Sequence, residues 1–406
     1  MHSHQWFHVR GLQGTQVLDV AHAAQLHLQK SGDCSGMGCL AQGDIATYYD
    51  RLSCLKIARW YVRNGGGFFW ASAFLRVQSL PTVVLSSGGT SSLALRHRGI
   101  GTLTGSRSAV AAGRIPVESV ACSIAADLLP YGVKTDTCTI VFCSWVDNYY
   151  VFGSSVPNAI QIAERFEEAL KLSWNLDIKP TSRSLLSPIV PADAWDNDKW
   201  PLVKEADVLG HLLSYDASPW PCWRRTEKSM WAAFWKNCLG PKVSSLGLRN
   251  RCRLLERSVK PVLFFRNTRW PWTQTLADVQ SRTLRRMLSY FIHMDRLPEE
   301  PLDSFHRRRM RKVSDTAKEY GEWGIEHARR ILAWADHLKR SRNGKSLAAE
   351  FFKWHDQYWL HARRLDPDVG SGAFRPGTQA APGPAVKRWD ESLIEADFFL
   401  RRAYNL

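Results

Sequence analysis

The chain has 406 residues, 45% of them hydrophobic, which is enough to bury a core in roughly two or three domains. Its 54 Lys and Arg against 38 Asp and Glu give a formal charge of +16, which predicts an anionic partner, a nucleic acid before a membrane surface. The 18 Trp exclude a basic tail poor in aromatics, although most single Trp residues belong in a core. The nine Cys show no paired metal spacing, and we find neither a signal sequence nor a membrane-spanning apolar run. We therefore expect an intracellular, soluble protein with no zinc site and no membrane partner.

The first half of the chain predicts alternating helices and strands. Apolar residues at helical spacing indicate a helix over residues 15–30, and a short apolar piece then leads into Asp44. We expect further helices over residues 50–63 and 105–129, and a strand over residues 81–86.

The clearest local signal is a β-hairpin between Thr137 and Phe152. Two runs rich in β-branched and aromatic residues flank the turn pair formed by Asp147 and Asn148. Ser155, followed by Pro157, then predicts the start of an amphipathic helix.

Beyond residue 216 the pattern changes to helices studded with Arg and Trp. The segments with helical periodicity are 226–238, 246–265, 272–293, 303–341 and 345–364. Residues 367–386 are rich in Gly and Pro and predict a flexible linker before a short last helix. Each Arg cluster is either a phosphate-binding surface or simply a solvated helix face; together they favour nucleic-acid binding.

Two carboxylates could carry chemistry. Asp44 follows an apolar strand and Asp147 lies at the hairpin tip, so both emerge at one edge of a sheet if their strands are neighbours. Two converging carboxylates can hold a pair of Mg²⁺ ions for nucleotidyl transfer. The alternatives are that Asp44 caps a helix and that Asp147 with Asn148 forms only a turn.

Five strings follow one another along the chain: QGDIATYYDRL from Gln42, RGIGTLTGSR from Arg98, FCSWVDN from Phe142, WNLDIKP from Trp174 and VLGHLL from Val208. In this order they resemble motifs A to E of reverse transcriptases. The helical C-terminal part is similar to that of LINE-type (non-LTR) retrotransposon proteins. The resemblance implies an α+β fold with a palm of antiparallel sheet and helices. Its parts would be a remnant of fingers (1–39), a palm (40–216), a helical thumb (217–300), a basic helical extension (301–366), a linker (367–386) and a C-terminal helix (387–406).

The resemblance also implies residue roles. Asp44 and Asp147 would be the catalytic metal ligands, joined by the backbone carbonyl of Ile45. Tyr49, five positions after Asp44, would exclude a 2′-hydroxyl, or else be a core aromatic. Four residues would contact the nucleotide or template: Tyr49, Gly105, Ser106 and Lys179. Lys179 is otherwise a solvated lysine, and His211 is expected to be a packing residue.

The sequence departs from the family pattern at three places. Asn148 stands where a second Asp is usual, which lowers the attraction for Mg²⁺. Thr104 replaces a common Gln, and Met1 lies only about forty residues before the motif A string, so we expect an N-terminally truncated protein without most of the fingers. Two functions follow as hypotheses: RNA-directed DNA polymerisation on an RNA template and DNA primer with deoxynucleoside triphosphates, or a catalytically inactive nucleic-acid-binding remnant of a retroelement.

Overall fold

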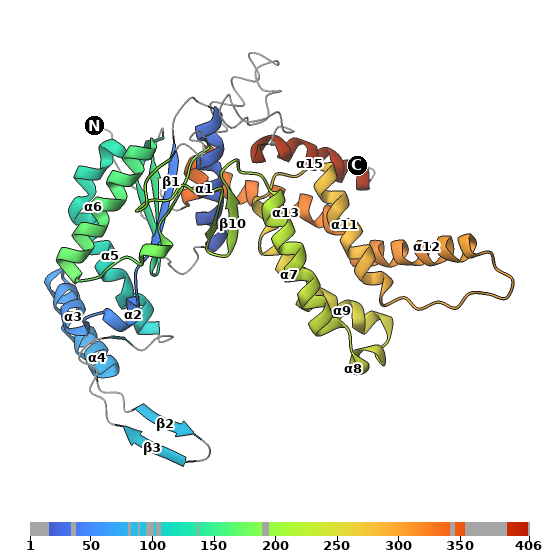
Figure 1. Ribbon diagram of the computed structural model, residues 1–406, viewed down its shortest axis with the longest axis horizontal. Coiled ribbons are helices and arrows are strands. Elements are labelled where there is room, and N and C mark those ends of the chain that lie inside the picture. The colour runs from blue at the N-terminus through green and yellow to red at the C-terminus, as the bar shows by residue number, and fades with distance from the viewer. Residues whose placement is uncertain are drawn as a thin grey trace. The chain divides into compact units, whose positions relative to one another are not determined.

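The protein forms two compact units in a computed structural model that describes residues 16–33, 38–79, 83–87, 90–94, 101–102, 107–135, 138–188, 195–341, 346–353 and 388–404. The first unit spans residues 36–203 together with residues 1–16, and the second spans residues 17–35 and 204–406. Helices and antiparallel strands both occur, so the predicted α+β class is confirmed (Figure 1).

A four-stranded antiparallel sheet forms the centre of the first unit. Its order is β6-β7-β1-β8, with β1 at Cys39–Asp44, β6 at Phe142–Trp145, β7 at Asn148–Gly153 and β8 at Ser184–Leu186. Strand β1 pairs with β7 from Cys39 opposite Gly153 to Asp44 opposite Asn148. Two small hairpins join β2 (Val83–Ser87) to β3 (Thr90–Ala94) and β4 (Val133–Lys134) to β5 (Thr139–Ile140).

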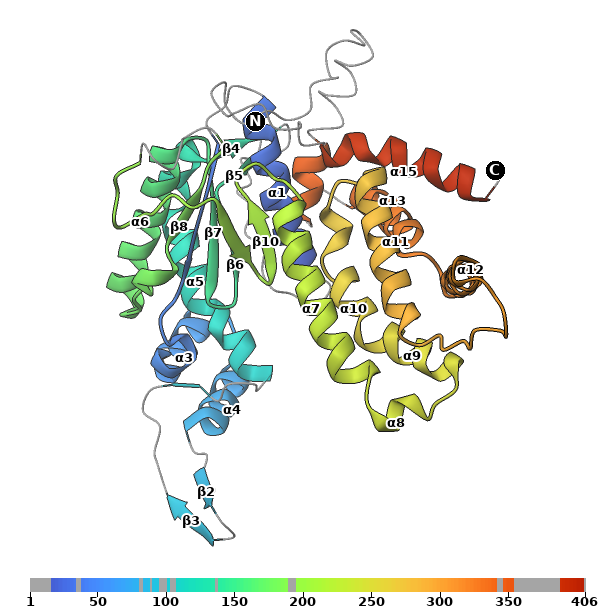
Figure 2. The ribbon, with the colours of Figure 1, turned by 45° about the vertical axis from the view of Figure 1, so that its right-hand side comes forward.

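Helices α5 (Arg107–Leu128) and α6 (Val156–Trp174) pack on one face of this sheet (Figure 2). Alternate strand residues such as Ala41 and Val151 point into the core that they share. Both sequence predictions here are confirmed: β6 and β7 form the hairpin, and Ser155 caps α6 by accepting the N–H of Asn158 at 3.2 Å. Short 3-10 helices lie at Leu129–Tyr131 and Pro180–Ser182.

The helix predicted over residues 50–63 is wrong as a single element. The structure has α2 (Tyr48–Arg51) and α3 (Cys54–Arg63), followed by α4 (Phe68–Ser79). Leu52 is extended, and Ser53 starts α3 by accepting the N–H of Lys56 at 3.3 Å. A serine that caps the second helix therefore divides the predicted helix in two.

One segment, Ser108–Tyr131, is long and apolar enough to cross a membrane by length and composition, contrary to the expectation from the sequence. Helix α5 makes up most of it, and its Ala112, Ile115 and Val120 are buried in the core of the first unit against α6. That packing accounts for its apolar character.

In the residues that the structure describes, the regular elements of the second unit are helices apart from the hairpin of β9 (Glu205–Val208) and β10 (His211–Ser214). Its helices are α1 (Val17–Asp33), α7 (Trp220–Cys238), α8 (Pro241–Ser244), α9 (Leu248–Ser258), α10 (Lys260–Phe264), the 3-10 turn η4 (Asn267–Arg269), α11 (Gln274–Ser289), α12 (Leu302–Tyr320), α13 (Trp323–Arg340) and α15 (Trp389–Tyr404). Two predicted helices, 246–265 and 303–341, are each broken in two; Gly321, at φ 84°, ends α12. Of the helix predicted over 345–364, residues 347–353 are helical, and 354–364 and the predicted linker 367–386 lie outside the described residues.

A buried arginine ties α1 to the rest of this unit. Arg269 is 2% exposed and donates to Oε1 of Gln25 on α1 and to the carbonyl of Leu212 on β10, each at 2.6 Å. Gln25 in turn donates to the carbonyl of Arg269 at 2.8 Å. Hydrogen bonds of this kind are what a buried guanidinium requires.

Candidate active site

Asp44 occupies the last position of β1, the strand between β7 and β8. The antiparallel register places Asn148, the first residue of β7, directly opposite it. The strands that carry the two candidate carboxylates are therefore neighbours, as the hypothesis of a shared sheet edge required.

Asp147 lies in the turn between β6 and β7. The N–H of Ile45 donates to the backbone carbonyl of Asp147 at 2.9 Å, which fixes the turn beside the end of β1. Val146, just before Asp147, has φ 60°, a left-handed conformation that is costly for a β-branched residue. Backbone strain of this kind is retained where the surrounding structure enforces it, and it gathers at functional sites.

The negative charge of Asp147 affects the pKa of Asp44. Burial raises the pKa of Asp44 above its usual range, the charge of Asp147 raises it further, and the ammonium of Lys179 offsets part of the effect. Oδ1 of Asp44 is buried and has no hydrogen-bond partner among the described residues. A buried carboxylate oxygen without a donor, next to a second carboxylate, is a site that a cation would stabilise.

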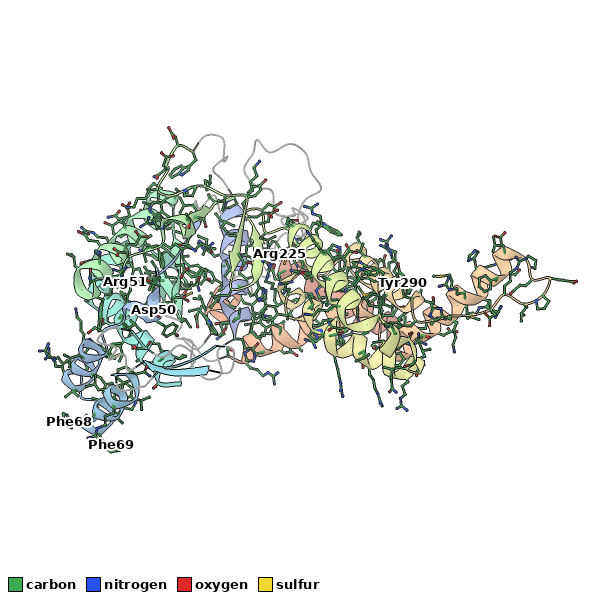
Figure 3. All side chains as sticks on the ribbon, turned by 60° about the horizontal axis from the view of Figure 1, so that its bottom comes forward. Asp50, Arg51, Phe68, Phe69, Arg225 and Tyr290 are labelled. Atoms are coloured by element: carbon green, nitrogen blue, oxygen red, sulfur yellow. The ribbon has the colours of Figure 1, made fainter. Side chains whose placement is uncertain are left out.

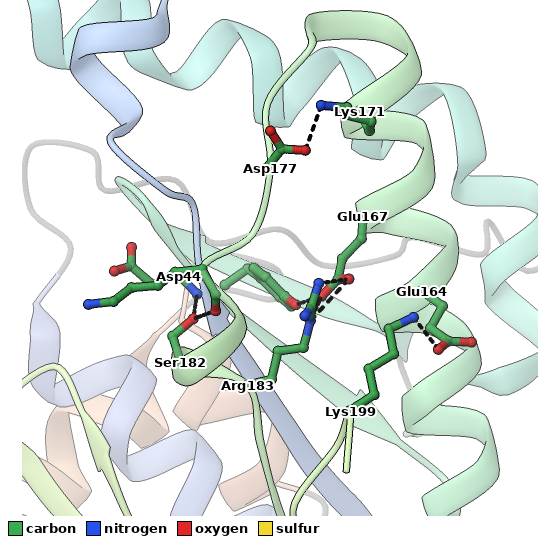
Figure 4. Close-up of polar contacts among 10 residues, drawn as sticks. Asp44, Glu164, Glu167, Lys171, Asp177, Ser182, Arg183 and Lys199 are labelled. Atoms are coloured by element: carbon green, nitrogen blue, oxygen red, sulfur yellow. Dashed lines mark hydrogen bonds and ion pairs between the residues drawn. The ribbon is translucent and has the colours of Figure 1, made fainter. Parts of the chain in front are cut away.

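Ser182 lies beside Asp44 (Figure 4) and fixes the backbone at Asp44 and at Lys179. Its Oγ accepts the backbone N–H of Asp44 at 2.9 Å, and its hydroxyl donates to the carbonyl of Lys179 at 2.7 Å. The N–H of Lys179 donates to the carbonyl of Asp44 at 2.9 Å. Three hydrogen bonds thus fix the backbone on both sides of the carboxylate.

Tyr49 is half-buried and packs at α5. The Cβ that an alanine would have at Gly113 would lie 3.4 Å from both the Tyr48 and the Tyr49 rings, and the Tyr48 hydroxyl donates to the carbonyl of Gly113. Burial and then Asp147 raise the pKa of Tyr49, while Arg114 opposes them. The charge of Asp147 therefore acts on the Tyr49 hydroxyl. This position agrees both with a role in excluding a 2′-hydroxyl and with a role as a core aromatic.

A hydrogen-bond network joins strand β7 to helix α6 (Figure 4). The Tyr149 hydroxyl donates to Oε1 of Glu167 at 2.6 Å, and Arg183 binds the same carboxylate through Nε at 2.9 Å and Nη2 at 2.7 Å. Gly43 permits this arrangement, because a Cβ there would lie 2.5 Å from the Tyr149 hydroxyl. The network holds Tyr149, which stands opposite Gly43, the residue that immediately precedes Asp44.

The structure thus brings together Asp44, Ile45, Tyr49, Asp147 and Lys179. Gly105 and Ser106 lie outside the described residues. Ser182, Gly113 and the Glu167 network were not predicted from the sequence; a serine three residues after Lys179 carries no signal of its own.

His211 belongs to the second unit and is fully buried. Burial, followed by the charges of Arg269 and Arg266, lowers its pKa to about 2. A histidine that stays neutral and buried is a packing residue, as predicted.

Part of the donor set for Mg²⁺ is available. Among the residues that the structure describes, no group of three or more His, Cys, Asp or Glu side chains could hold a metal ion. Mg²⁺, however, is commonly bound through one or two carboxylates with substrate phosphates and water supplying the rest. The unpartnered oxygen of Asp44, the carboxylate of Asp147 and a carbonyl at Ile45 fit that mode.

Comparison with known proteins gives distant structural likenesses without support from sequence. No family model matches the chain, and neither does any curated protein. The structure of telomerase from Candida albicans, in complex with a fragment of telomeric RNA, matches with a TM-score of 0.32 and 10% identity, over 86% of this chain and 53% of that chain. The chain thus spans about half the length of that telomerase chain. A likeness this distant carries no conclusion about activity.

Proposed function

We propose that the chain is a reverse transcriptase of LINE-type retrotransposon descent, which polymerises DNA on an RNA template. The observation that carries the proposal is the register of β1 and β7, which sets Asp44 beside the turn that bears Asp147. Five motif-like strings in family order support the proposal, because five motifs in order are more specific than any single motif.

Asp44 and Asp147, with the carbonyl of Ile45, would hold two Mg²⁺ ions. Bound there, the ions would stabilise the attacking 3′-oxygen and the leaving pyrophosphate. Asp44 must lose its proton to act as a ligand, and Lys179 favours that loss. The Tyr49 ring would exclude a 2′-hydroxyl, Lys179 would protonate the pyrophosphate, and Gly105 with Ser106 would line the nucleotide and template site.

The basic second unit would bind the template–primer backbone. Helix α7 exposes Arg224 and Lys228, and α11 exposes Arg282 and Arg286. The Arg286 guanidinium lies 5.4 Å from the centre of the Trp231 ring, so cations and aromatic rings share this surface. Phosphate contacts of this kind give salt-dependent affinity without sequence preference.

Primer extension tests the proposal. We expect the purified chain to extend a DNA primer on RNA with Mg²⁺ and deoxynucleotides, and both Asp44→Ala and Asp147→Ala to abolish extension. Asp198→Ala, which removes an exposed carboxylate of the first unit away from the site, is the matched control and should extend normally. Binding of the same template–primer is measured in parallel, so that lost chemistry is distinguished from lost binding.

A second function, a nucleic-acid-binding remnant without catalysis, is favoured by one observation. Asn148 provides an uncharged amide where a second carboxylate would strengthen the attraction for Mg²⁺. Binding of the template–primer with no extension by the wild-type chain would establish this function and exclude the polymerase.

A further inference from the structure

Two adjacent phenylalanines at the start of α4 lie on the outside of the first unit. Phe68 is 76% exposed and Phe69 is 86% exposed. Figure 3 shows both rings at the outer end of α4, away from the sheet. Large apolar rings in tandem at such exposure are costly in water unless a partner covers them.

The turn that presents these rings is well packed. The Tyr61 and Trp70 rings are 4.3 Å apart, and Trp70 stacks on Phe74 at 5.1 Å, so the inner aromatics of α3 and α4 lock together. The N–H of Gly66 donates to the carbonyl of Tyr61 at 2.9 Å. The exposure of Phe68 and Phe69 is therefore a fixed property of this helical pair.

The stretch of chain that contains the pair carries charges of one sign only. From Arg51 to Val117, both ends included, the chain has nine Lys or Arg and no Asp or Glu. Arg59 and Arg63 on α3 and Arg76 on α4 are all exposed. Among the described residues, no ion pair joins these three arginines to an acidic side chain. The partner of this surface is therefore expected to be anionic.

We propose that the outer surface of α3 and α4 binds a single-stranded nucleic acid, whose bases stack on Phe68 and Phe69 while Arg59, Arg63 and Arg76 bind its phosphates. Rings and cations together define this occupant, because unpaired bases offer free faces for stacking and a duplex does not. An acidic protein would satisfy the arginines, but stacking of bases accounts for both rings at once. The inference does not depend on polymerase activity, and the surface is separate from Asp44 and Asp147.

Affinity for fluorescent single-stranded oligouridine is the first test, with oligodeoxythymidine and an RNA duplex in parallel. We expect the double variant Phe68→Ala with Phe69→Ala to lose at least about 30-fold in affinity for the single strands, while duplex binding is unchanged. Phe398→Ala removes a phenylalanine that is 64% exposed on α15 and should have no effect. Arg59→Gln with Arg63→Gln should lower the slope of log affinity against log salt by about 1.4. The relative affinity for the two oligonucleotides shows whether RNA or DNA is preferred.

Photocrosslinking gives a second readout that background binding elsewhere cannot mimic. A 5-iodouridine oligonucleotide crosslinked to the full chain should modify the tryptic peptide 64–76, which contains both rings, and leave peptide 389–401, which contains Phe398, unmodified. Unchanged single-strand affinity of the double variant, or crosslinks that avoid peptide 64–76, would overturn the proposal. The proposal would also be overturned if the double variant lost its binding to phosphatidylserine vesicles, or its self-association, and kept its affinity for the oligonucleotides.

Discussion

The side-chain amide of Asn148 donates a hydrogen bond to Oδ1 of Asp147 across 3.1 Å. In the ladder of β1 and β7 the same residue stands opposite Asp44. An amide can donate here, whereas a carboxylate could only accept. Asn148 therefore stabilises the candidate site without adding a third negative charge.

Asn148→Asp should make the protein more dependent on Mg²⁺. Without a divalent ion, the lost hydrogen bond and the added charge should lower the free energy of unfolding by about 1–2 kcal/mol. With Mg²⁺, Tm should rise more in this variant than in the wild type, because the third carboxylate attracts the ion. Thermal unfolding in chelator and in Mg²⁺ measures both. Asn148→Ala, which loses the hydrogen bond without adding charge, should show no such gain; an equal Mg²⁺ response in all three proteins would contradict the site.

Ser182→Ala should reduce both primer extension and stability. It removes the hydrogen bonds to the N–H of Asp44 and to the carbonyl of Lys179, which should cost about 1–2 kcal/mol in the free energy of unfolding. Because the backbone around a metal ligand is then less well fixed, we expect at least about a tenfold loss of extension rate. Ser182→Thr keeps the hydroxyl and should recover part of the rate. Equal activity of the alanine variant and the wild type would exclude a positioning role.

Gly43→Ala should destabilise the first unit by about 1–3 kcal/mol. The new Cβ would lie 2.5 Å from the Tyr149 hydroxyl and would displace it from Glu167. Urea titration measures the change. Gly67→Ala is the control, because a Cβ there would have no atom within 4 Å other than those of Gly67 and its two chain neighbours. Similar midpoints for the two variants would show that the Tyr149 network tolerates the shift.

The stability of the second unit should fall as pH drops below about 6.5. Burial lowers the pKa of His327 to about 4, as it lowers that of His211 to about 2, from an ordinary 6.5. The unfolded chain then binds protons that the folded chain does not, so each histidine should remove about 2 kcal/mol between pH 7 and pH 5. Above pH 7 this contribution is fully present. Urea titrations at the two pH values measure the loss.

Substitution of a single histidine measures its contribution to this pH-dependent loss of stability. His211→Gln should roughly halve the part of this loss that comes from the two buried histidines, and His306→Gln, at an exposed histidine, should leave it unchanged. If His211→Gln has the same pH dependence as the wild type, His211 does not contribute.

Local signals in the sequence predicted the elements that bear the candidate site. The runs around Asp147 and the cap at Ser155 are short-range features, and both were found. Apart from the pairing of Asp44 with Asp147, contacts between distant residues were not predicted: Ser182 lies 138 residues from Asp44, and neither residue type indicates the other. Helix breaks at Ser53 and Gly321 were missed because helical periodicity continues on both sides of each break. Pairing of carboxylates was predicted from family resemblance more than from the pattern of residues.

Helix α1 leaves the ribosome long before its partners. Its Gln25 bonds with Arg269, which is 244 residues later in the chain, and its His22 accepts the indole N–H of Trp334 at 2.8 Å. At roughly 5–20 residues per second, the apolar surface of α1 stays uncovered for at least about ten seconds of synthesis. The nascent chain is therefore most prone to aggregation while the intervening first unit is being made. For the same reason, a recombinant fragment of residues 36–203 should aggregate less than one of residues 1–203, which would carry α1 without the residues that cover it.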